Sequence, residues 1–218
     1  MALSVESGVV ITGALVAFAR LFPIMNPPAM APVFQEMTQA VPAKQRNRMA
    51  FFVALYTFYL LTSLLLVGGW LLRALGVSID MIGIAGGILL FHTAWGMLNR
   101  GDRLTRSERE EIKCMTGKVF FPLTMPMTAG PGSIAVTLSM IPGGPFFSLD
   151  TMFEITGLCA GIALSSAMVW IFYRFSGVFL SRLGETAKAT IGQISAFILL
   201  AIGVQLIWGS LSNLIRAL

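Results

Sequence analysis

Two proline-rich segments carry the residues whose types and spacing could do chemistry. The first contains Pro23, Pro27 and Pro32, and the second repeats its Phe-Pro-x3-Pro-x4-Pro pattern at positions 122, 126 and 131, each 99 residues after its counterpart. Small neutral residues stand beside these prolines: Asn26 in the first copy and, in the second, Thr124, Thr128, Ala129, Gly130, Gly132 and Ser133. Their amide, hydroxyl and backbone groups could hold a small polar solute by hydrogen bonds.

A proline break also frees the N-terminal end of the helix that follows it. Proline removes a backbone donor, and its ring clashes with the preceding turn. The freed N–H groups and their partial positive charge suit an anionic group such as an amino-acid carboxylate. Gly130 and Gly132 would let the backbone come close to a ligand. The segments therefore predict a solute site that includes Asn26 and Pro27, against the alternative that the prolines only kink helices for packing.

Composition indicates what surrounds these segments. Of the 218 residues, 56% are hydrophobic and 11% are charged, whereas soluble domains carry about 25% charged residues. We therefore expect an integral membrane protein, whose net charge of +5 belongs to its loops rather than to a nucleic-acid site. Broken backbone survives in a membrane only inside protein or beside a water-filled cavity. Two breaks at matching positions point to a transporter site between internal repeats.

Six regions are long and apolar enough to cross a bilayer, which takes about 20 residues each. The first is broken at Pro23 to Pro28 and the fourth between Pro126 and Gly132. We predict an all-α polytopic membrane protein with six transmembrane helices in two inverted three-helix repeats, because an odd number of spans turns the second copy upside down. The predicted repeats cover residues 1–98 and 119–218, and a polar cytoplasmic loop, 99–118, joins them. The expected spans are residues 8–37, 50–72, 79–98, 119–141, 153–175 and 191–211.

The basic residues predict the orientation. With six crossings, three connections share one side and carry 12 of the 15 Lys and Arg residues, whereas the other side carries only Arg73 and Arg216. By the positive-inside rule the basic side is cytoplasmic. We therefore expect an inner-membrane protein with both termini on the outer, periplasmic side. A rival topology with two re-entrant hairpins would place Arg174, Arg182 and Lys188 outside, against the rule.

Arg20 is a basic residue deep inside the first predicted span. It lies about 18 Å along the helix from Gly8, at 1.5 Å per residue, and therefore near the bilayer midplane, where a charge is costly. One interpretation is that it attracts a carboxylate, either of a substrate or of a gating residue. The alternative is that its side chain snorkels to the interface.

Other polar and small residues inside the spans have structural interpretations. The single histidine, His92, is expected to be a hydrogen-bonded core residue rather than a proton relay. Gln193 and Gln205 are expected to form hydrogen bonds between helices rather than line a pathway. The Gly-x3-Gly pairs at 83–87 and 157–161 predict close helix contact within the molecule rather than a dimer seam.

No arrangement of residues favours an enzyme. The sequence has no Cys–His pair at a useful spacing, no paired intramembrane carboxylates, no metal-ligand cluster and no phosphate-binding loop. We expect no catalytic residue, cofactor or metal, and no disulfide between Cys114 and Cys159. Within the polar loop, Thr105 and Ser107 each precede a glutamate by three residues, a capping-box pattern that predicts a short helix.

The two broken segments resemble the signature segments of the MarC family of multi-pass inner-membrane proteins. The resemblance rests on Asn26-Pro27 and on Ala129-Gly130-Pro131-Gly132, and it extends to chain length and the Ile84-Ala85-Gly86-Gly87 turn. It implies transport of small neutral amino acids, as in the SnatA-type members. The chain departs from the expected pattern at Arg20, where we expect an apolar residue, and at Pro28-Ala29, where we expect Leu-Gly or similar.

The resulting hypothesis is a secondary transporter of glycine, alanine and serine, in which one repeat moves against the other around a substrate held at the two breaks. The partners expected are a small amino acid and the lipid bilayer, with no nucleic acid, and the oligomeric state stays open. One alternative is export of another small anionic or zwitterionic solute. Further alternatives are a lipid-handling, scramblase-like protein and a non-transporting membrane scaffold.

Overall fold

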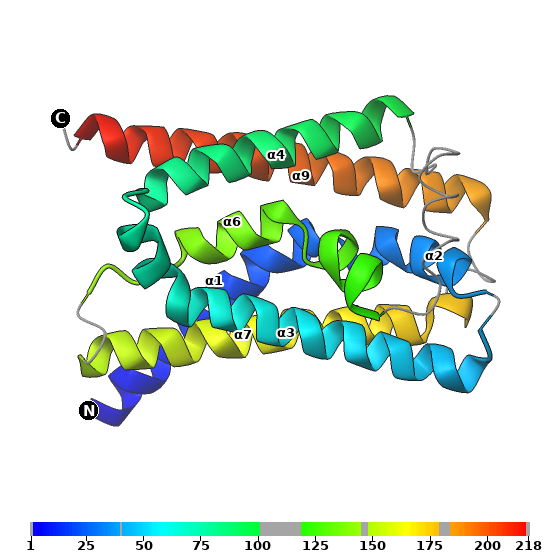
Figure 1. Cartoon of the computed structure of the whole chain (residues 1–218), viewed down its shortest axis with the longest axis horizontal. Coiled ribbons are helices and arrows are strands. Elements are labelled where there is room, and N and C mark those ends of the chain that lie inside the picture. The colour runs from blue at the N-terminus through cyan, green and yellow to red at the C-terminus, as the bar shows by residue number, and fades with distance from the viewer. Residues whose placement is uncertain (1, 40, 101–118, 145–147, 179–183, 217–218) are drawn as a thin grey trace.

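The computed structural model describes residues 2–39, 41–100, 119–144, 148–178 and 184–216, and every regular element in these ranges is helical (Figure 1). The predicted loop helix near residues 105–113 and Cys114 lie outside the described residues. The elements are α1 (Ala2–Met25), α2 (Pro27–Met37), α3 (Ala43–Ala74), α4 (Ile79–Arg100), the π-helix η1 (Val119–Thr128), α6 (Pro131–Ser139), α7 (Leu149–Arg174) and α9 (Glu185–Arg216).

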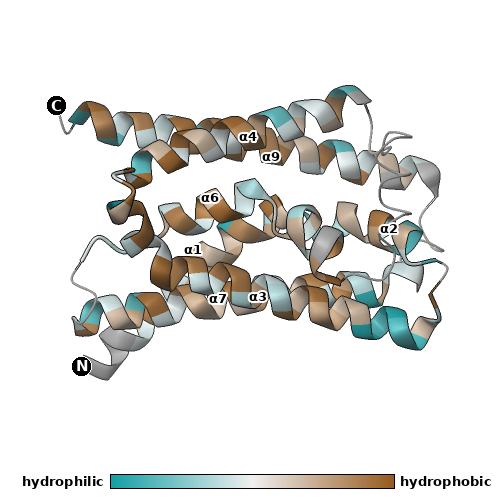
Figure 2. Ribbon diagram, in the orientation of Figure 1, coloured by the Kyte–Doolittle hydropathy of each residue, from teal (hydrophilic) through white to brown (hydrophobic). Residues whose placement is uncertain are grey.

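The described helices have the apolar outer surface of a multi-pass integral membrane protein. Five of them are long and apolar enough to cross a membrane: α1, α3, α4, α7 and α9. Large apolar side chains cover their outer faces, and Trp70 and Trp208 are 68% and 69% exposed. The apolar residues extend along the middle of the bundle, and hydrophilic ones gather toward helix ends (Figure 2). The fourth predicted span is not among the five, because it consists of η1 and α6, which have 10 and 9 residues.

Four long helices frame the bundle, and the interrupted segments lie between them (Figure 1). The pair α4–α9 forms one side, and α3 and α7 form the other. Between these sides, α1 leads into α2 and η1 leads into α6, so that each interrupted segment extends along the bundle in two pieces. The start of α1 and the end of α9 lie at the same end of the molecule, which we call the terminal end.

The tightest helix contacts are made through glycine, and they join helices that are far apart in the sequence. A Cβ on Gly161 of α7 would meet the backbone of α1 at Ala14 and lie 2.6 Å from Cβ of Ala17. A Cβ on Gly87 of α4 would lie 2.7 Å from the carbonyl oxygen of Gly203 on α9. Both predicted Gly-x3-Gly pairs therefore pack within the molecule, which confirms that expectation.

The first interruption is a single residue. Asn26 adopts φ 46° and ψ 54°, in the left-handed region, and α2 begins directly after it with Pro27. Proline suits this first helical position because its missing N–H would have no helical partner there. Pro23 and Pro32 lie inside α1 and α2, so the predicted break over Pro23 to Pro28 is narrower than expected.

The second interruption lies within the predicted range but has a different local structure. η1 is a π-helix, in which the backbone N–H of Ala129 donates to the carbonyl of Thr124 at 2.8 Å, five residues earlier. Gly130 is extended, with φ −75° and ψ 176°, and Pro131 starts α6. The sequence predicted the position of this break, but it did not predict the wider helical turn before it.

Candidate functional site

The two interruptions meet in the interior of the bundle. Met25, Asn26 and Pro27 are buried at the first break. A Cβ on Gly132, just after the second break, would press against the side chain of Leu90 and lie 3.6 Å from Cγ2 of Ile24. The structure therefore brings together two segments about a hundred residues apart, as the sequence predicted. The predicted site residues buried at the second break are Thr124, Thr128, Ala129, Gly132 and Ser133.

Asn26 has an unused donor at this meeting point. Its backbone groups are satisfied, because its N–H donates to Phe22 at 3.0 Å and its carbonyl accepts from Met30 at 3.0 Å. Its side chain is 6% exposed, and its Nδ2 has no hydrogen-bond partner among the described residues. A buried amide donor without an acceptor is costly, so Asn26 is a candidate for contact with a bound solute.

The two threonines of η1 use their hydroxyls within the protein. Thr124 Oγ1 donates to the carbonyl of Val119 at 3.0 Å, and Thr128 Oγ1 donates to that of Leu123 at 2.7 Å. The 2.9 Å bond between Thr128 Oγ1 and Tyr173 Oη then uses the tyrosine as donor, because the threonine hydroxyl has only one hydrogen. These bonds hold η1 in place and tie it to α7.

Tyr173 is a residue of this region that the sequence reasoning missed. It is fully buried, and its ring stacks on Phe34 of α2 with centroids 4.5 Å apart. It therefore connects both interrupted segments, through Phe34 on one side and Thr128 on the other. The sequence contains one indication of this role, since Tyr173 lies near the end of an apolar span and a buried tyrosine needs a partner for its hydroxyl.

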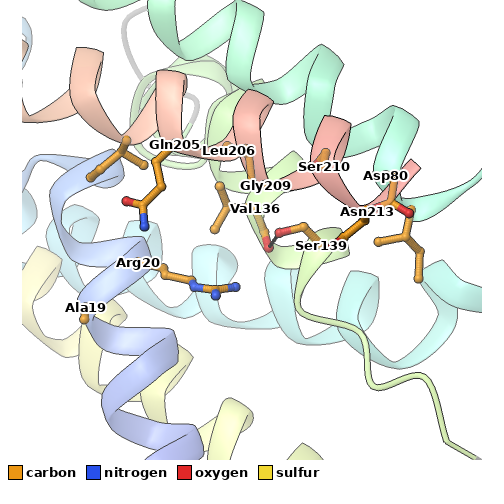
Figure 3. Close-up of a pocket in the computed structure, with 12 residues that line it drawn as sticks. Ala19, Arg20, Asp80, Val136, Ser139, Gln205, Leu206, Gly209, Ser210 and Asn213 are labelled. Atoms are coloured by element: carbon orange, nitrogen blue, oxygen red, sulfur yellow. Dashed lines mark hydrogen bonds between the residues drawn. The ribbon is translucent and has the colours of Figure 1, made fainter. Parts of the chain in front are cut away.

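A pocket of about 500 Å³ lies between α1, α4, α6 and α9, and no residue of either break lines it. Arg20 is the only residue of the predicted site that lines it. Figure 3 shows its guanidinium extending into this space and the side chain of Gln205 entering the same space from α9. The pocket's polar lining comes from Arg20, Asp80, Ser139, Gln205, Ser210 and Asn213.

Polar groups at the two ends of the pocket differ in their partners. Asn213 Nδ2 donates to Oδ1 of Asp80 at 3.2 Å, which joins the end of α9 to the start of α4. Ser139 Oγ donates to the carbonyl of Val136 at 2.8 Å. Arg20 makes no hydrogen bond or ion pair with any residue that the structure describes. Arg20 and Asn26 therefore do not line the same pocket, and Arg20 is an exposed side chain at the wall of an open one.

The expectations for the other intramembrane polar residues were wrong. His92 on α4 and Gln193 and Gln205 on α9 are all exposed, and none of them forms a hydrogen bond with a residue that the structure describes. The reason for His92 is helical periodicity, since it lies two residues after Leu90 and therefore about 200° around the helix. The face of α4 that packs inward is formed by Gly83, Gly86, Gly87, Leu90 and Ala94.

Several more hydroxyls near the middle of the long helices were not singled out from the sequence. Thr57 of α3 and Ser165 and Ser166 of α7 are buried, and their hydroxyls have no partner among the described residues. The described residues contain no group of three or more His, Cys, Asp or Glu side chains that could hold a metal ion. The polar groups at the breaks are therefore amides, hydroxyls and backbone rather than charged ligand sets.

These features define a multi-pass integral membrane protein in which two interrupted helices meet beside a cavity. The chain belongs to the MarC family: the family described as MarC family integral membrane protein matches residues 12–215. This confirms the resemblance drawn from the broken segments.

Relatives from distant organisms match over most of their length. The chain is 28% identical to the UPF0056 membrane protein YvbG of Bacillus subtilis, over 92% of this chain and 95% of the relative. It is 32% identical to a UPF0056 membrane protein of Aquifex aeolicus, over 92% of each chain. It is 31% identical to the UPF0056 membrane protein YhcE of Escherichia coli, over 87% of each chain. No solved structure matches.

Proposed function

We propose that this MarC-family protein is a transporter of small neutral amino acids, such as glycine, alanine and serine, that works by alternating access. The observation that carries the proposal is the meeting of two interrupted helices, at which Asn26 Nδ2 is buried without a partner among the described residues. Interrupted helices at matching positions in two halves are typical of secondary-transporter binding sites. The substrate class comes from the SnatA-type members of the family.

The proposed site uses the start of each second half-helix. At the start of α6, the backbone N–H groups of Gly132 and Ser133 precede the first helical bond, which Ile134 donates to Gly130 at 3.2 Å, and such groups suit a carboxylate. The start of α2 offers only the N–H of Ala29 before the Met30 bond, because Pro27 and Pro28 have none. Asn26 would add its side-chain amide from the first break, with Thr124, Thr128 and Ser133 shaping the site around the backbone of Ala129, Gly130 and Gly132. Leu90 and Ile24 crowd Gly132, so the space favours substrates with small side chains.

The proposal includes six crossings arranged as two inverted repeats. Its support is the order of elements, because an interrupted segment followed by two long helices occurs twice: α1/α2, α3, α4 and then η1/α6, α7, α9. The positions of the helix ends in Figure 1 also support it, since the start of α1 and the end of α9 lie at the same end of the molecule, as an even number of crossings requires.

The proposed orientation places the terminal end in the periplasm and the opposite end in the cytoplasm. The opposite end carries Lys44, Arg46 and Arg48 at the start of α3 and Arg174 at the end of α7. The terminal end carries Asp80 in the first turn of α4 and Asp150 in the first turn of α7. This distribution agrees with the positive-inside rule for an inner-membrane protein.

The moving bodies we propose differ from the two sequence halves. Helices from different halves pack tightly together, α1 with α7 and α4 with α9. In the described part of the chain, the α4–α9 pair meets the remaining helices chiefly through α6. We therefore expect the α4–α9 pair to rock against a body of α1, α3 and α7, rather than one repeat against the other.

Counterflow in proteoliposomes tests the function. Vesicles loaded with unlabelled alanine should accumulate radiolabelled alanine saturably, with glycine and serine as competitors, and Asn26→Leu should abolish uptake. Gly96→Ala is the matched control, because a Cβ there meets nothing within 4 Å, and it should transport normally. No saturable uptake of any of the three amino acids by folded, inserted native protein would contradict the proposed substrate class.

A further inference from the structure

The pocket around Arg20 is a separate place from the two breaks. Arg20 precedes Asn26 by six residues, which is about 9 Å along α1. On the other wall, Val136 lies five residues after Pro131, at which α6 begins, or about 7.5 Å from the second break. A solute in this pocket would therefore be one to two helical turns from the breaks.

The charge of Arg20 calls for an anionic occupant. Arg20 belongs to a membrane-spanning helix, where an arginine usually faces a partner or a water-filled cavity and marks a solute pathway. It has no ion pair with a described residue, and it faces a pocket of about 500 Å³, within the usual range of about 300–1,000 Å³ for small-molecule sites. A guanidinium binds a carboxylate through two parallel hydrogen bonds, which makes it more selective than a point charge.

Groups from other helices complete a site for one end of a small amino acid. Gln205 of α9 enters the pocket from the wall opposite α1 (Figure 3) and offers amide donors. Asp80 lies farther along the pocket, where Asn213 holds it. Its carboxylate does not neutralise Arg20, and it would repel a second anion while attracting an ammonium group.

The position of the pocket indicates its place in transport. Asp80 begins α4 and Asn213 lies in the last turn of α9, so both belong to the terminal end of the bundle. The pocket extends from these residues to Arg20, which lies deeper along α1. It therefore extends from the terminal end toward the breaks and stops one to two helical turns short of them.

We propose that this pocket is a carboxylate-binding station, in which Arg20 and Gln205 hold the carboxylate of a small amino acid on its way between the terminal end and the breaks. This inference rests on the proposed function, which it deepens by adding a second binding position. It also explains why a charged residue stands where the family resemblance predicts an apolar one.

Binding measured by calorimetry on purified protein in detergent tests the station without depending on transport. The probes are alanine, alaninamide, which lacks the carboxylate, and propionate, which lacks the ammonium group. Arg20→Met should weaken the binding of alanine and propionate by roughly 10- to 100-fold, the range expected for a charged hydrogen bond. It should leave the weak binding of alaninamide unchanged.

Two further variants keep the test decisive. Arg20→Lys retains the charge but loses the forked geometry, so it should bind alanine more weakly than the native protein and more tightly than Arg20→Met. If Arg20→Met does not fold, the affinity of Arg20→Lys for alanine tests the station instead. Arg73→Gln removes one positive charge outside the pocket, where Arg73 Nε donates to Gly69 at 3.1 Å, and it should bind as the native protein does.

The outcomes separate the station from the transport proposal. If both Arg20 variants bind alanine with native affinity, the proposed station is wrong. If the same variants still perform counterflow, the proposed transport function stands. Absence of amino-acid counterflow by the native protein, together with propionate binding that Arg20→Met abolishes, would refute amino-acid transport and support the carboxylate site. Absence of binding of both alanine and propionate to the native protein would overturn the station.

Discussion

Replacing Asn26 with glycine and with alanine separates what this residue does for folding from what it does for transport. Asn26 holds the left-handed conformation, with φ 46°, and its buried Nδ2 has no partner among the described residues. Both substitutions remove the amide. Only alanine keeps a Cβ in the left-handed conformation, so the two variants differ in backbone strain while sharing the loss of the donor.

The expected free energies of unfolding follow from the loss of the buried amide donor and from the change in backbone strain. Removing a buried donor that lacks an acceptor relieves a penalty of about 1–3 kcal/mol, and the greater backbone entropy of unfolded glycine offsets about 0.5–1 kcal/mol of this. The free energy of unfolding of Asn26→Gly should therefore exceed that of the native protein by about 1 kcal/mol. A Cβ in the left-handed region costs about 1–2 kcal/mol, but alanine avoids the entropy cost of glycine, about 0.5–1 kcal/mol, so Asn26→Ala should lie about 0.5–1 kcal/mol below the glycine variant.

Transport should behave differently from stability. A hydrogen bond to a charged group is worth about 1.5–3 kcal/mol, and about 1.4 kcal/mol corresponds to a tenfold change in affinity. Alanine counterflow at concentrations below saturation should therefore fall about tenfold or more in both variants, to a similar extent. Stability is measured in mixed micelles by titrating a denaturing detergent and following tryptophan fluorescence.

Native-like counterflow by Asn26→Gly would refute the assignment of Asn26 to the substrate site. A glycine variant less stable than the native protein would refute the claim that the buried Asn26 amide lacks a partner, because its loss would then remove a stabilising hydrogen bond. Parallel loss of transport and stability in both variants would favour a purely structural role for Asn26.

Three further predictions address the packing and the orientation. Gly87→Ala would place a Cβ 2.7 Å from a backbone oxygen of α9, against 3.4 Å for ordinary contact, so α4 and α9 must separate by about 0.7 Å (3.4 − 2.7), and overpacking of this kind costs about 1–3 kcal/mol. The control is Gly96→Ala on the same helix, where the added Cβ meets nothing within 4 Å. Equal unfolding free energies for the two variants would contradict the glycine contact. Tyr173→Phe removes the hydrogen bond to η1 and should lower the free energy of unfolding by about 1 kcal/mol in the same detergent titration, with an unchanged value counting against that bond. In a chain whose native cysteines are replaced by serine, an impermeant maleimide should label Arg73→Cys in intact cells and Lys44→Cys only after permeabilisation; the reverse pattern would invert the proposed orientation.

The break positions were predictable because proline acts locally. A proline at the first position of α2 or α6 fits any helix start, and Asn26 and Gly130 are residue types that adopt turns readily. The roles of Pro23 and Pro32 could not be told apart from that of Pro27 by this local rule, because neighbouring packing decides whether a helix tolerates a proline. The π-helical turn of η1 depends on Thr124 and Thr128 bonding to carbonyls five residues back, which the spacing of apolar residues does not reveal.

The polar residues of the long helices illustrate what sequence spacing could and could not decide. The spacing of small residues on α4 already places His92 on a different face from the glycines. The exposure of His92 could therefore have been predicted from the sequence. Gln205 was different, because its exposed position on α9 becomes a pocket wall only when α1 and α6 come close. No property of α9 alone distinguishes a lipid-facing glutamine from one that faces a cavity.

The sequence by itself determined the class of this protein, the approximate positions of its long helices and the places where two of them are interrupted. These properties depend on hydropathy and on backbone chemistry within a few residues of each position. Only the tertiary structure decided that α1 packs on α7 and α4 on α9, and that Arg20 faces a pocket. Those outcomes depend on which small residues of distant helices allow close approach, and such contacts arise between surfaces rather than within one stretch of chain.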